Sequence, residues 1–477
     1  MPLTDAYRPD PLYLHLGPGF ADPVKPAAFP QAILRFRNQR WAKAVGLDAL
    51  TDEEWAAHFH RFEPLPQNIP QPLAMRYHGH QFRNYNPDIG DGRGFLFAQV
   101  RDRHDRLLDL GTKGSGQTPY SRFGDGRLTL KGGVREILAA SMLEAQGVYT
   151  SKAFSLFETG EALERGDEPS PTRSSVLVRL QHSHIRFGTF QRAAFFEDKD
   201  QIAALVRHVG EAYHPDVLAA PEADQPAALL RAVTAATARM CAQWMAVGFV
   251  HGVLNTDNMV VTGESFDYGP WRFLPQSAPN FTAAYFDQTG LYSFGRQPEA
   301  SSWNLAQLAG CLALISEEAP LVEALQGFAP AYHAAIRQAM HARLGLEPLD
   351  EDSDLGFLQT LFAWMTESGA AWDQTFHDWF CGEASAQRAA ASPQAALYAA
   401  AAFAPVRDGL FARRPVRADR LSNPVFQAAT PVSLVIEEVE GLWAPIAEAD
   451  DWGAFHAKLG AIDALREALS IASPSAP

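Results

Sequence analysis

The chain has 477 residues, of which 47% are hydrophobic and 20% are charged, and its formal net charge is −15. This composition excludes a disordered chain and supports a large core, and the length favours two or three packing units. The negative charge argues against a general binder of nucleic acids or anionic membranes, because such proteins need a basic surface.

The cysteines and the first residues bear on the compartment. Cys241, Cys311 and Cys381 are scattered singly, which indicates neither a zinc site nor a disulfide framework. The start, MPLTDAYRPD, lacks the basic and apolar regions of a signal peptide. The most apolar run, residues 305–315, is too short to span a bilayer and predicts a buried helix. We therefore expect a cytoplasmic protein with no membrane or nucleic-acid partner.

The first half of the chain predicts strands around a glycine-rich loop. Residues 1–75 are rich in proline and aromatic residues, and we expect an irregular extension with one short helix near DEEWAAHF. After GDGRG, the apolar runs FLFAQV and LLDLGTKG predict two strands, the second ending at Lys113. A glycine-rich loop follows over residues 114–128. Residues 134–147 predict a helix that carries Glu136, and residues 175–190 predict further strands.

Beyond residue 200 the sequence predicts helices. Residues 228–249 form a long amphipathic pattern, residues 301–319 a second, and the alanine-rich residues 391–406 a third. Residues 468–477 are expected to fray. A mixed first half and a helical second half predict an α+β fold of two lobes with a cleft between them. We expect an extension over 1–75, an N-lobe over 76–195 and a helical C-lobe over 196–477.

The long helix leads into HGVLNTDNM, residues 251–259, which is similar to a kinase catalytic loop without its base. In kinases an Asp two residues after the His accepts a hydroxyl proton, and a later Asn binds metal. Here Val253 stands at the Asp position, whereas Asn258 is kept with Asp257 beside it. We expect a short hairpin to return Asp267 to the side of Asn258. Amide and carboxylate oxygens suit Mg²⁺ or Mn²⁺ on a nucleotide.

Lys113 and Glu136 complete this pattern. A strand lysine paired with a helix glutamate holds a phosphate-binding ammonium in one rotamer in kinase-like sites. Arg93, within GDGRG, would add a cation where glycine backbone can approach phosphate. Each residue alone has an ordinary explanation, but their order favours a phosphate site. A P-loop is excluded, because its lysine follows the glycines whereas Lys113 precedes Gly114 and Gly116.

The sequence also contains three His-x-His pairs, which are His58/His60, His78/His80 and His182/His184. On a strand each pair would share one face and could bind a metal. No carboxylate or cysteine pattern accompanies them, so we expect ordinary packing and hydrogen bonding.

Five segments lie within roughly residues 70–310: YNPDIGDGRG, the run from Leu110 to Ala140, FETGE, HGVLNTDNM and FDYGP. Together they resemble the selenoprotein O family, also called the YdiU family. The resemblance implies a protein-kinase-like fold and a pseudokinase that binds ATP in a flipped orientation. It implies a protein adenylyltransferase, which moves AMP from ATP onto Ser, Thr or Tyr hydroxyls of proteins, with the enzyme itself as one candidate target.

The flipped orientation would explain the missing base. It places the α-phosphate at the mouth of the cleft, so the kinase base position faces the wrong atoms and can become Val253. The metal ligands must remain, because charge still builds on the transferring phosphoryl group. The resemblance places the proton acceptor at Asp257, the Mg²⁺ or Mn²⁺ ligands at Asn258 and Asp267, and the lysine partner at Glu136. It places nucleotide contacts at Gly90, Gly92, Arg93, Lys113, Asp125, Gly126, Arg179, Arg186 and Asp267.

Without the resemblance, Arg179 and Arg186 would be interpreted as cross-strand ion pairs, and Asp125 with Gly126 as a turn. The chain also departs from the family, since no cysteine follows Cys381 and the family's C-terminal redox motif cannot be carried over. Three alternatives stay open. They are a kinase that moves the γ-phosphate, a Mn²⁺-dependent uridylyltransferase that uses UTP, and an inactive nucleotide-binding pseudokinase.

Overall fold

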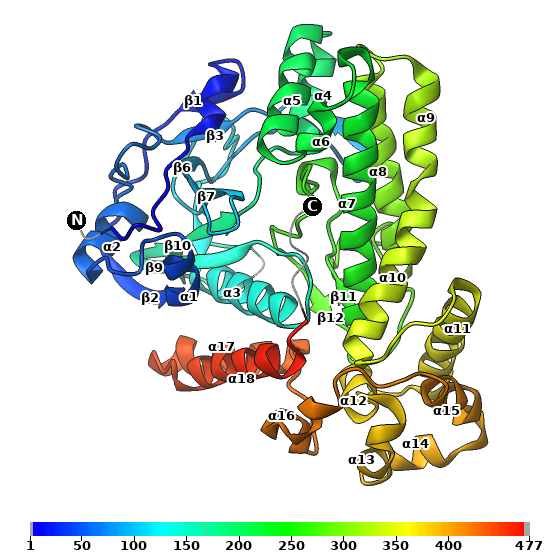
Figure 1. The fold of residues 1–477 in the computed structure, drawn as a ribbon. Helices are drawn as coiled ribbons and strands as arrows, with labels where there is room; N and C mark the ends of the chain where they lie inside the picture. The colour runs from blue at the N-terminus through cyan, green and yellow to red at the C-terminus, as the bar shows by residue number, and fades with distance from the viewer. Residues whose placement is uncertain (1–2, 167, 472–477) are drawn as a thin grey trace.

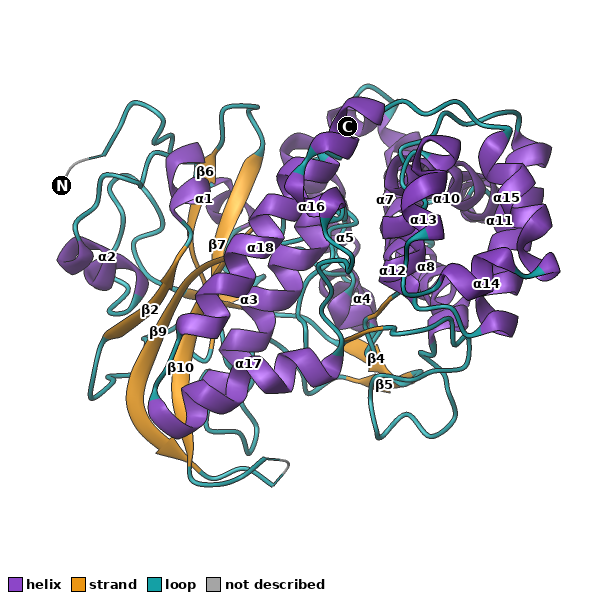
Figure 2. Ribbon diagram, turned by 90° about the horizontal axis from the view of Figure 1, so that it is seen from below, coloured by secondary structure: helices purple, strands orange, loops and turns teal. Residues whose placement is uncertain are grey.

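The computed structural model describes residues 3–166 and 168–471, with a sheet-rich N-terminal part beside a helical C-terminal part (Figure 1). The α+β class predicted from the sequence is therefore confirmed. In Figure 2 the sheet lies along one side of the molecule and most of the helices along the other. Within the described ranges, no helix is both long enough and apolar enough to cross a membrane.

One antiparallel sheet dominates the N-terminal part. Its strands follow the order β1, β3, β6, β7, β10, β9, β2, and β8 pairs with β10. Lys113, at the end of β7, lies opposite Leu177 of β10, two residues from Arg179. Because side chains alternate along a strand, Lys113 and Arg179 point to the same face. The strands are β1 (Ala21–Pro23), β2 (Ile33–Arg37), β3 (Leu73–Met75), β4 (Gly79–Gln81), β5 (Asn84–Asn86), β6 (Leu96–Arg101), β7 (Leu107–Lys113), β8 (Leu128–Thr129), β9 (Lys152–Leu163), β10 (Thr172–Gln181), β11 (Phe249–Val250) and β12 (Arg272–Phe273).

The first 75 residues are more regular than the sequence predicts. Helix α2 (Asp52–Phe59) confirms the helix expected at DEEWAAHF, and a capping box closes its first turn. The same region also supplies β1, β2 and β3, which were not predicted. Trp55 of α2 stacks on Phe154 of β9 with ring centroids 5.1 Å apart. The N-terminal residues thus complete the sheet and cover its outer face.

Helix α3 (Leu130–Ala145) lies on the inner face of the sheet and carries Glu136. It begins before residue 134 because the Thr129 side chain accepts a hydrogen bond from the Gly132 amide. At Gly133 an added Cβ would lie 2.5 Å from Leu156 Cδ1 and 2.9 Å from Ser175 Oγ. The helix can approach the sheet this closely only because residue 133 has no side chain.

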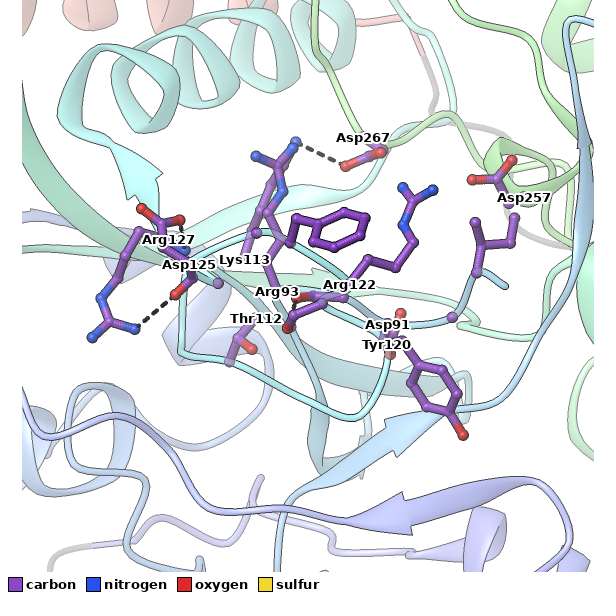
Figure 3. Close-up of a pocket in the computed structure, with 18 of the residues that line it drawn as sticks. Asp91, Arg93, Thr112, Lys113, Tyr120, Arg122, Asp125, Arg127, Asp257 and Asp267 are labelled. Atoms are coloured by element: carbon purple, nitrogen blue, oxygen red, sulfur yellow. Dashed lines mark hydrogen bonds and ion pairs between the residues drawn. The ribbon is translucent and has the colours of Figure 1, made fainter. Parts of the chain in front are cut away.

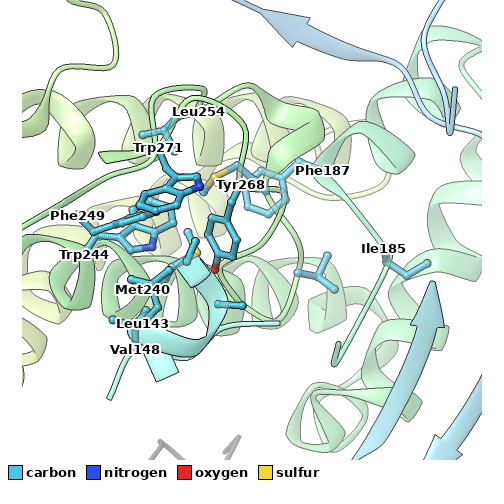
Figure 4. Close-up of a cluster of buried hydrophobic side chains, with 14 of the residues drawn as sticks. Leu143, Val148, Ile185, Phe187, Met240, Trp244, Phe249, Leu254, Tyr268 and Trp271 are labelled. Atoms are coloured by element: carbon cyan, nitrogen blue, oxygen red, sulfur yellow. The ribbon is translucent and has the colours of Figure 1, made fainter. Parts of the chain in front are cut away.

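The central helix of the C-terminal part is α7 (Gln225–Val247), which confirms the long helix predicted there. It ends at Val247, and the next residue, Gly248, reverses the chain toward the 251–259 loop with a left-handed φ of 66°. Figure 4 shows Trp244 of α7 among Phe249, Trp271 and Leu143, the last of which comes from α3. One hydrophobic cluster therefore continues from the helices that cover the sheet into the helical part.

One strand prediction and one helix prediction are wrong. Strand β10 ends at Gln181, and residues 187–190 begin α4 (Phe187–Phe195) instead of continuing as strand. Phe187 and Phe190 are both fully buried, and their spacing of three suits one face of a helix. The alanine-rich residues 391–406 form no continuous helix, because α14 (Ala395–Ala399) ends and a proline in the first turn of α15 (Ala404–Phe411) prevents continuation.

The C-terminal helices return to the sheet. Helix α18 (Gly453–Leu469) lies against α3, and α17 (Ile436–Ala449) lies beside it (Figure 1). Of the end expected to fray, residues 472–477 lie outside the described residues. The other helices are α1 (Gln39–Ala44), α5 (Lys199–Ala212), α6 (Pro215–Leu218), α8 (Gln297–Leu312), α9 (Glu318–Gln326), α10 (Phe328–Leu344), α11 (Glu351–Ser368), α12 (Trp372–Asp378), α13 (Ala386–Ala390) and α16 (Pro424–Gln427).

The close approach of α3 to the sheet can be tested at Gly133. We expect Gly133→Leu to lower the free energy of unfolding by about 1–3 kcal/mol, because the new side chain must push α3 away from Leu156. Gly310→Leu in α8 is the matched control, since nothing lies within 4 Å of a Cβ there. The control should be neutral or stabilising by up to about 1 kcal/mol. Equal stabilities of the two variants in urea denaturation would contradict the packing described.

Candidate active site

A cavity of about 730 Å³ opens between the sheet, the glycine-rich loop 114–128 and the segment that follows α7 (Figure 3). In Figure 3 Asp125 lies at one end of the cavity and Asp257 at the other, with Lys113 and Asp267 between them. Glu136 and Asn258 do not line the cavity but lie directly behind residues that do. The predicted residues that line it are Gly90, Gly92, Arg93, Lys113, Asp125, Gly126, Arg179, Arg186, Asp257 and Asp267.

A buried network of charges forms the floor of this cavity. Lys113 Nζ lies 2.6 Å from Glu136 Oε1 and 2.8 Å from Asp267 Oδ1. Arg179 Nη1 lies 3.1 Å from the same oxygen of Asp267. Burial alone would raise the pKa of Asp267, but the surrounding cations, led by Lys113, hold that pKa well below its usual range. Asp267 is therefore ionised, and it balances cations that a phosphate could otherwise contact.

Arg186 joins the glycine-rich GDGRG segment to the loop after α7. Its Nη1 donates to the backbone oxygen of Asp257 at 2.7 Å, and its Nη2 lies 3.2 Å from Asp91 Oδ1. The guanidinium also stacks over Tyr77, 4.6 Å from the ring centroid. These contacts fix the buried Arg186 beside the cavity. Arg186 therefore does not form the cross-strand ion pair that the residues alone suggested.

Asp257 lies in a short 3-10 turn, η3 (Thr256–Asn258), and lines the cavity at the end opposite Asp125. The turn is fixed from outside, because Thr256 Oγ1 accepts from the His80 amide at 2.7 Å. Asp257 Oδ1 is buried and has no hydrogen-bond partner among the described residues. Burial raises the pKa of Asp257 to about 6, against the opposing effect of Arg186. A carboxylate with a raised pKa that faces a cavity is suited to accept a proton.

The predicted hairpin between Asn258 and Asp267 does not form. Val260 instead makes a backbone bridge to Arg186, and Ser265 makes one to Thr150. These two bridges hold the segment between Asn258 and Asp267 against residues of the N-terminal part. Asp267 itself has a left-handed φ of 63° and lines the cavity. The hairpin expectation failed because the pairing partners lie far away in the sequence.

The oxygen atoms around η3 suit a divalent cation that arrives with a phosphate ligand. Asn258 Nδ2 donates to Val253 O at 3.0 Å, and this orientation leaves the amide oxygen of Asn258 for a cation. The ionised Asp267, the other metal ligand predicted from the sequence, offers a further hard oxygen. The described chain contains no group of three or more His, Cys, Asp or Glu residues that could hold a metal.

The three His-x-His pairs make ordinary hydrogen bonds. His60 contacts the backbone oxygen of Gln31 at 2.9 Å, His80 contacts Gln191, and His182 contacts Tyr149. The cysteines Cys241, Cys311 and Cys381 are buried free thiols.

Close backbone contacts hold the glycine-rich loop against the GDGRG segment. Gly126 has a left-handed φ of 70°, and an added Cβ there would lie 2.2 Å from the carbonyl carbon of Gly116. The Ser121 hydroxyl donates to the backbone oxygen of Gly92, and an added Cβ at Gly90 would lie 2.4 Å from the Tyr120 ring. The carboxylate of Asp125 is paired with Arg165 Nη1 at 2.9 Å. Gly90 and Gly126 are therefore needed for the packing of the loop against its neighbours, and they do more than form a turn.

Several cavity residues were missed by the sequence analysis. Asp91 was hidden inside GDGRG, where a short polar residue between glycines suggests only a turn. Tyr77 and Tyr120 lie in stretches without periodicity. For Arg122 and Phe123, at the tip of the loop, the sequence held one usable signal. Phe123 is an apolar residue in a polar, glycine-rich segment.

Comparison with known proteins gives the same family over nearly the whole chain. The model of the family described as protein adenylyltransferase SelO matches residues 5–462. A protein of Synechococcus elongatus named protein nucleotidyltransferase YdiU is 51% identical over 352 residues, which cover 73% of this chain and 70% of that protein. A protein of the same name from Gloeobacter violaceus is 43% identical over 463 residues, which cover 94% of each chain. One from Pseudomonas putida is 37% identical over 378 residues, which cover 79% of this chain and 76% of that protein. This chain is therefore a nucleotidyltransferase and belongs to the family of protein adenylyltransferase SelO, also represented by the YdiU proteins.

Proposed function

We propose that this chain transfers AMP from ATP to Ser, Thr or Tyr hydroxyl groups of proteins. One observation carries the proposal: the buried cations Lys113, Arg179 and Arg186 meet in the cavity that Asp257 also lines. The cations suit the phosphate tail of ATP. A carboxylate with a free oxygen suits the proton of the hydroxyl that attacks the α-phosphorus. The description of the matching family, protein adenylyltransferase, supports the same chemistry.

We also propose a protein-kinase-like fold in two lobes, divided near residue 195. The arrangement of β7, α3 and β9 supports it, because a lysine strand is followed by a glutamate helix that packs on the same sheet. The long helix α7 and the loop with Asn258 follow in the order that kinases use. The N-terminal 75 residues act in this proposal as an extension of the first lobe.

The distribution of burial favours the flipped orientation of ATP. Lys113, Arg179 and Arg186 are nearly inaccessible, whereas Arg122 and Asp125 are exposed on the rim. A triphosphate tail that pairs with the buried cations places its β- and γ-phosphates deepest. The α-phosphate is then the phosphate closest to the mouth, where a protein hydroxyl can approach. The loss of a carboxylate at Val253 fits this orientation.

In the proposed reaction the hydroxyl oxygen of the target forms a bond to the α-phosphorus of ATP. The bond from that phosphorus to the oxygen bridging to the β-phosphate breaks, and pyrophosphate leaves. Asp257 accepts the hydroxyl proton or orients the hydroxyl for attack. Lys113, oriented by Glu136, and Arg179 bind the phosphates that leave. Mg²⁺ or Mn²⁺, held by Asn258 and Asp267 together with phosphate oxygens, would supply charge stabilisation when bound.

The position of the transferred phosphate can be tested with labelled ATP. We expect label at the α-phosphate to remain on a protein substrate or on the enzyme itself, and label at the γ-phosphate to leave with pyrophosphate. Mass spectrometry of the product should show an added AMP. Retention of the γ-label would instead identify a kinase, and a preference for UTP over ATP in competition would identify a uridylyltransferase.

The role of Asp257 can be separated from nucleotide binding. Asp257→Asn should lower AMP transfer by at least about 100-fold, because the amide cannot accept the proton. Its affinity for ATP should stay within about three-fold, because the phosphates are held by cations. Asp88→Asn, at an exposed carboxylate outside the cavity lining, is the control. Transfer by the Asp257 variant at the native rate would remove Asp257 from the mechanism.

The role of the buried cations can be tested by comparing ATP with AMP. Arg179→Met should weaken ATP binding by about ten-fold or more, since a hydrogen bond to a charged group is worth about 1.5–3 kcal/mol. AMP lacks the β- and γ-phosphates, so the affinity for AMP should change much less. Arg103→Met, at an exposed arginine in the 101–106 turn, should change neither. An equal loss for ATP and AMP in calorimetry would argue against a tail bound by Arg179.

A further inference from the structure

The tip of the glycine-rich loop presents an aromatic ring to the cavity. Phe123 lines the cavity and is fully exposed, the most exposed large apolar side chain among the described residues. The residue before it, Arg122, has a left-handed φ of 52°, which is unfavourable for a residue with a side chain. A strained backbone that holds an apolar ring in water gives no stability, so the ring needs another explanation.

The rest of the loop is fixed in place. Ser121 is bound to the backbone of Gly92, and Gly116 N donates to Gly126 O at 3.1 Å. Gln117 Nε2 donates to Gly124 O at 2.9 Å, which closes the loop from within. The backbone on both sides of Phe123 is therefore anchored to the cavity wall, and the position of the ring is largely set before any ligand arrives.

The other aromatic rings that line the cavity already have partners. Tyr77 is buried beneath the guanidinium of Arg186. The ring of Tyr120 packs against Gly90, and its hydroxyl donates to Asp22. For Phe123 the described part of the chain records no ring stacking and no cation over the ring, so both faces of the ring are available.

We propose that Phe123 is the residue on which the nucleobase of the bound nucleotide stacks, and that it sets a preference for purine over pyrimidine nucleotides. This inference rests on the proposed function, because it needs a nucleotide whose phosphates pair with the buried cations. With the tail held by Lys113 and Arg179, the nucleoside is the outer end of the ligand and lies toward the exposed rim. A large purine covers more of a phenyl ring than a pyrimidine does, so stacking favours ATP over UTP.

The test compares ligands with and without a base. We would measure equilibrium binding of the α,β-methylene analogues of ATP and UTP, which cannot transfer their nucleotide, and of inorganic triphosphate. Phe123→Ala should weaken the ATP analogue about ten-fold, weaken the UTP analogue less, and leave inorganic triphosphate unchanged. Phe123→Trp should restore the affinity for the ATP analogue, and its fluorescence should change when that analogue binds. Because Phe123 is fully exposed, neither variant should change the melting temperature.

Tyr285→Ala is the matched control, since Tyr285 is also highly exposed but does not line the cavity. It should leave all three affinities unchanged. Unchanged binding of the ATP analogue to Phe123→Ala, with reduced AMP transfer to a protein, would show that the ring contacts the target protein and would overturn the proposal. An equal loss for the ATP analogue and triphosphate would also overturn it, because the ring would then only support the shape of the loop. If the native chain bound neither analogue, the proposed function itself would fail, and this inference with it.

Discussion

The site depends on one buried network of opposite charges, in which Lys113 and Arg179 face Glu136 and Asp267. These side chains come from β7, β10, α3 and the loop after α7, so the network holds only if all of these elements keep their relative positions. Removing one partner from a buried pair of charges costs about 3–5 kcal/mol, because the remaining charge is left uncompensated. The same interactions that shape the cavity therefore also join the sheet to the helical part.

Helix α3 carries the glutamate of this network, and it is restrained from both sides. Gly133 lets it lie directly on the sheet, and α18 covers its other face. The turn between α17 and α18 is in turn tied to the sheet, where Asp450 pairs with Arg173 at 2.7 Å and with Arg35 at 2.9 Å. The C-terminal segment, in which no cysteine follows Cys381, is thus tied to the N-terminal part by ion pairs. It also packs on α3, the helix that carries Glu136.

Much of this arrangement could be predicted from local pattern. The lysine strand, the glutamate helix and α7 each have a strong periodicity and a clear end, so their order already indicated how Lys113 and Glu136 would meet. Residues whose environment is set by distant contacts could not be predicted in this way. Arg186 is buried by Tyr77 and Asp91, and nothing in its neighbourhood in the sequence signals those partners.

The errors have the same origin. The apolar residues after Gln181 were assigned to a strand because a short apolar run does not distinguish strand from helix. The alanine-rich segment was predicted as one helix because alanine has the highest helix propensity, but its prolines decide where helices begin. The hairpin before Asp267 failed because Val260 and Ser265 pair with residues that are far away in the chain. The nucleotide contacts of Arg179 and Arg186 came from the family resemblance, since the residues alone favoured cross-strand ion pairs. Asp125 and Gly126 alone would likewise have been interpreted as a turn.

The position of Asp267 has a consequence for the resting protein. Its carboxylate already neutralises Lys113 and Arg179, and it thus stands where the negative charge of a substrate would otherwise be. A carboxylate paired with both cations reduces the positive charge that an incoming anion would meet. In the proposed function, a phosphate tail must therefore compete with Asp267 for Lys113 and Arg179.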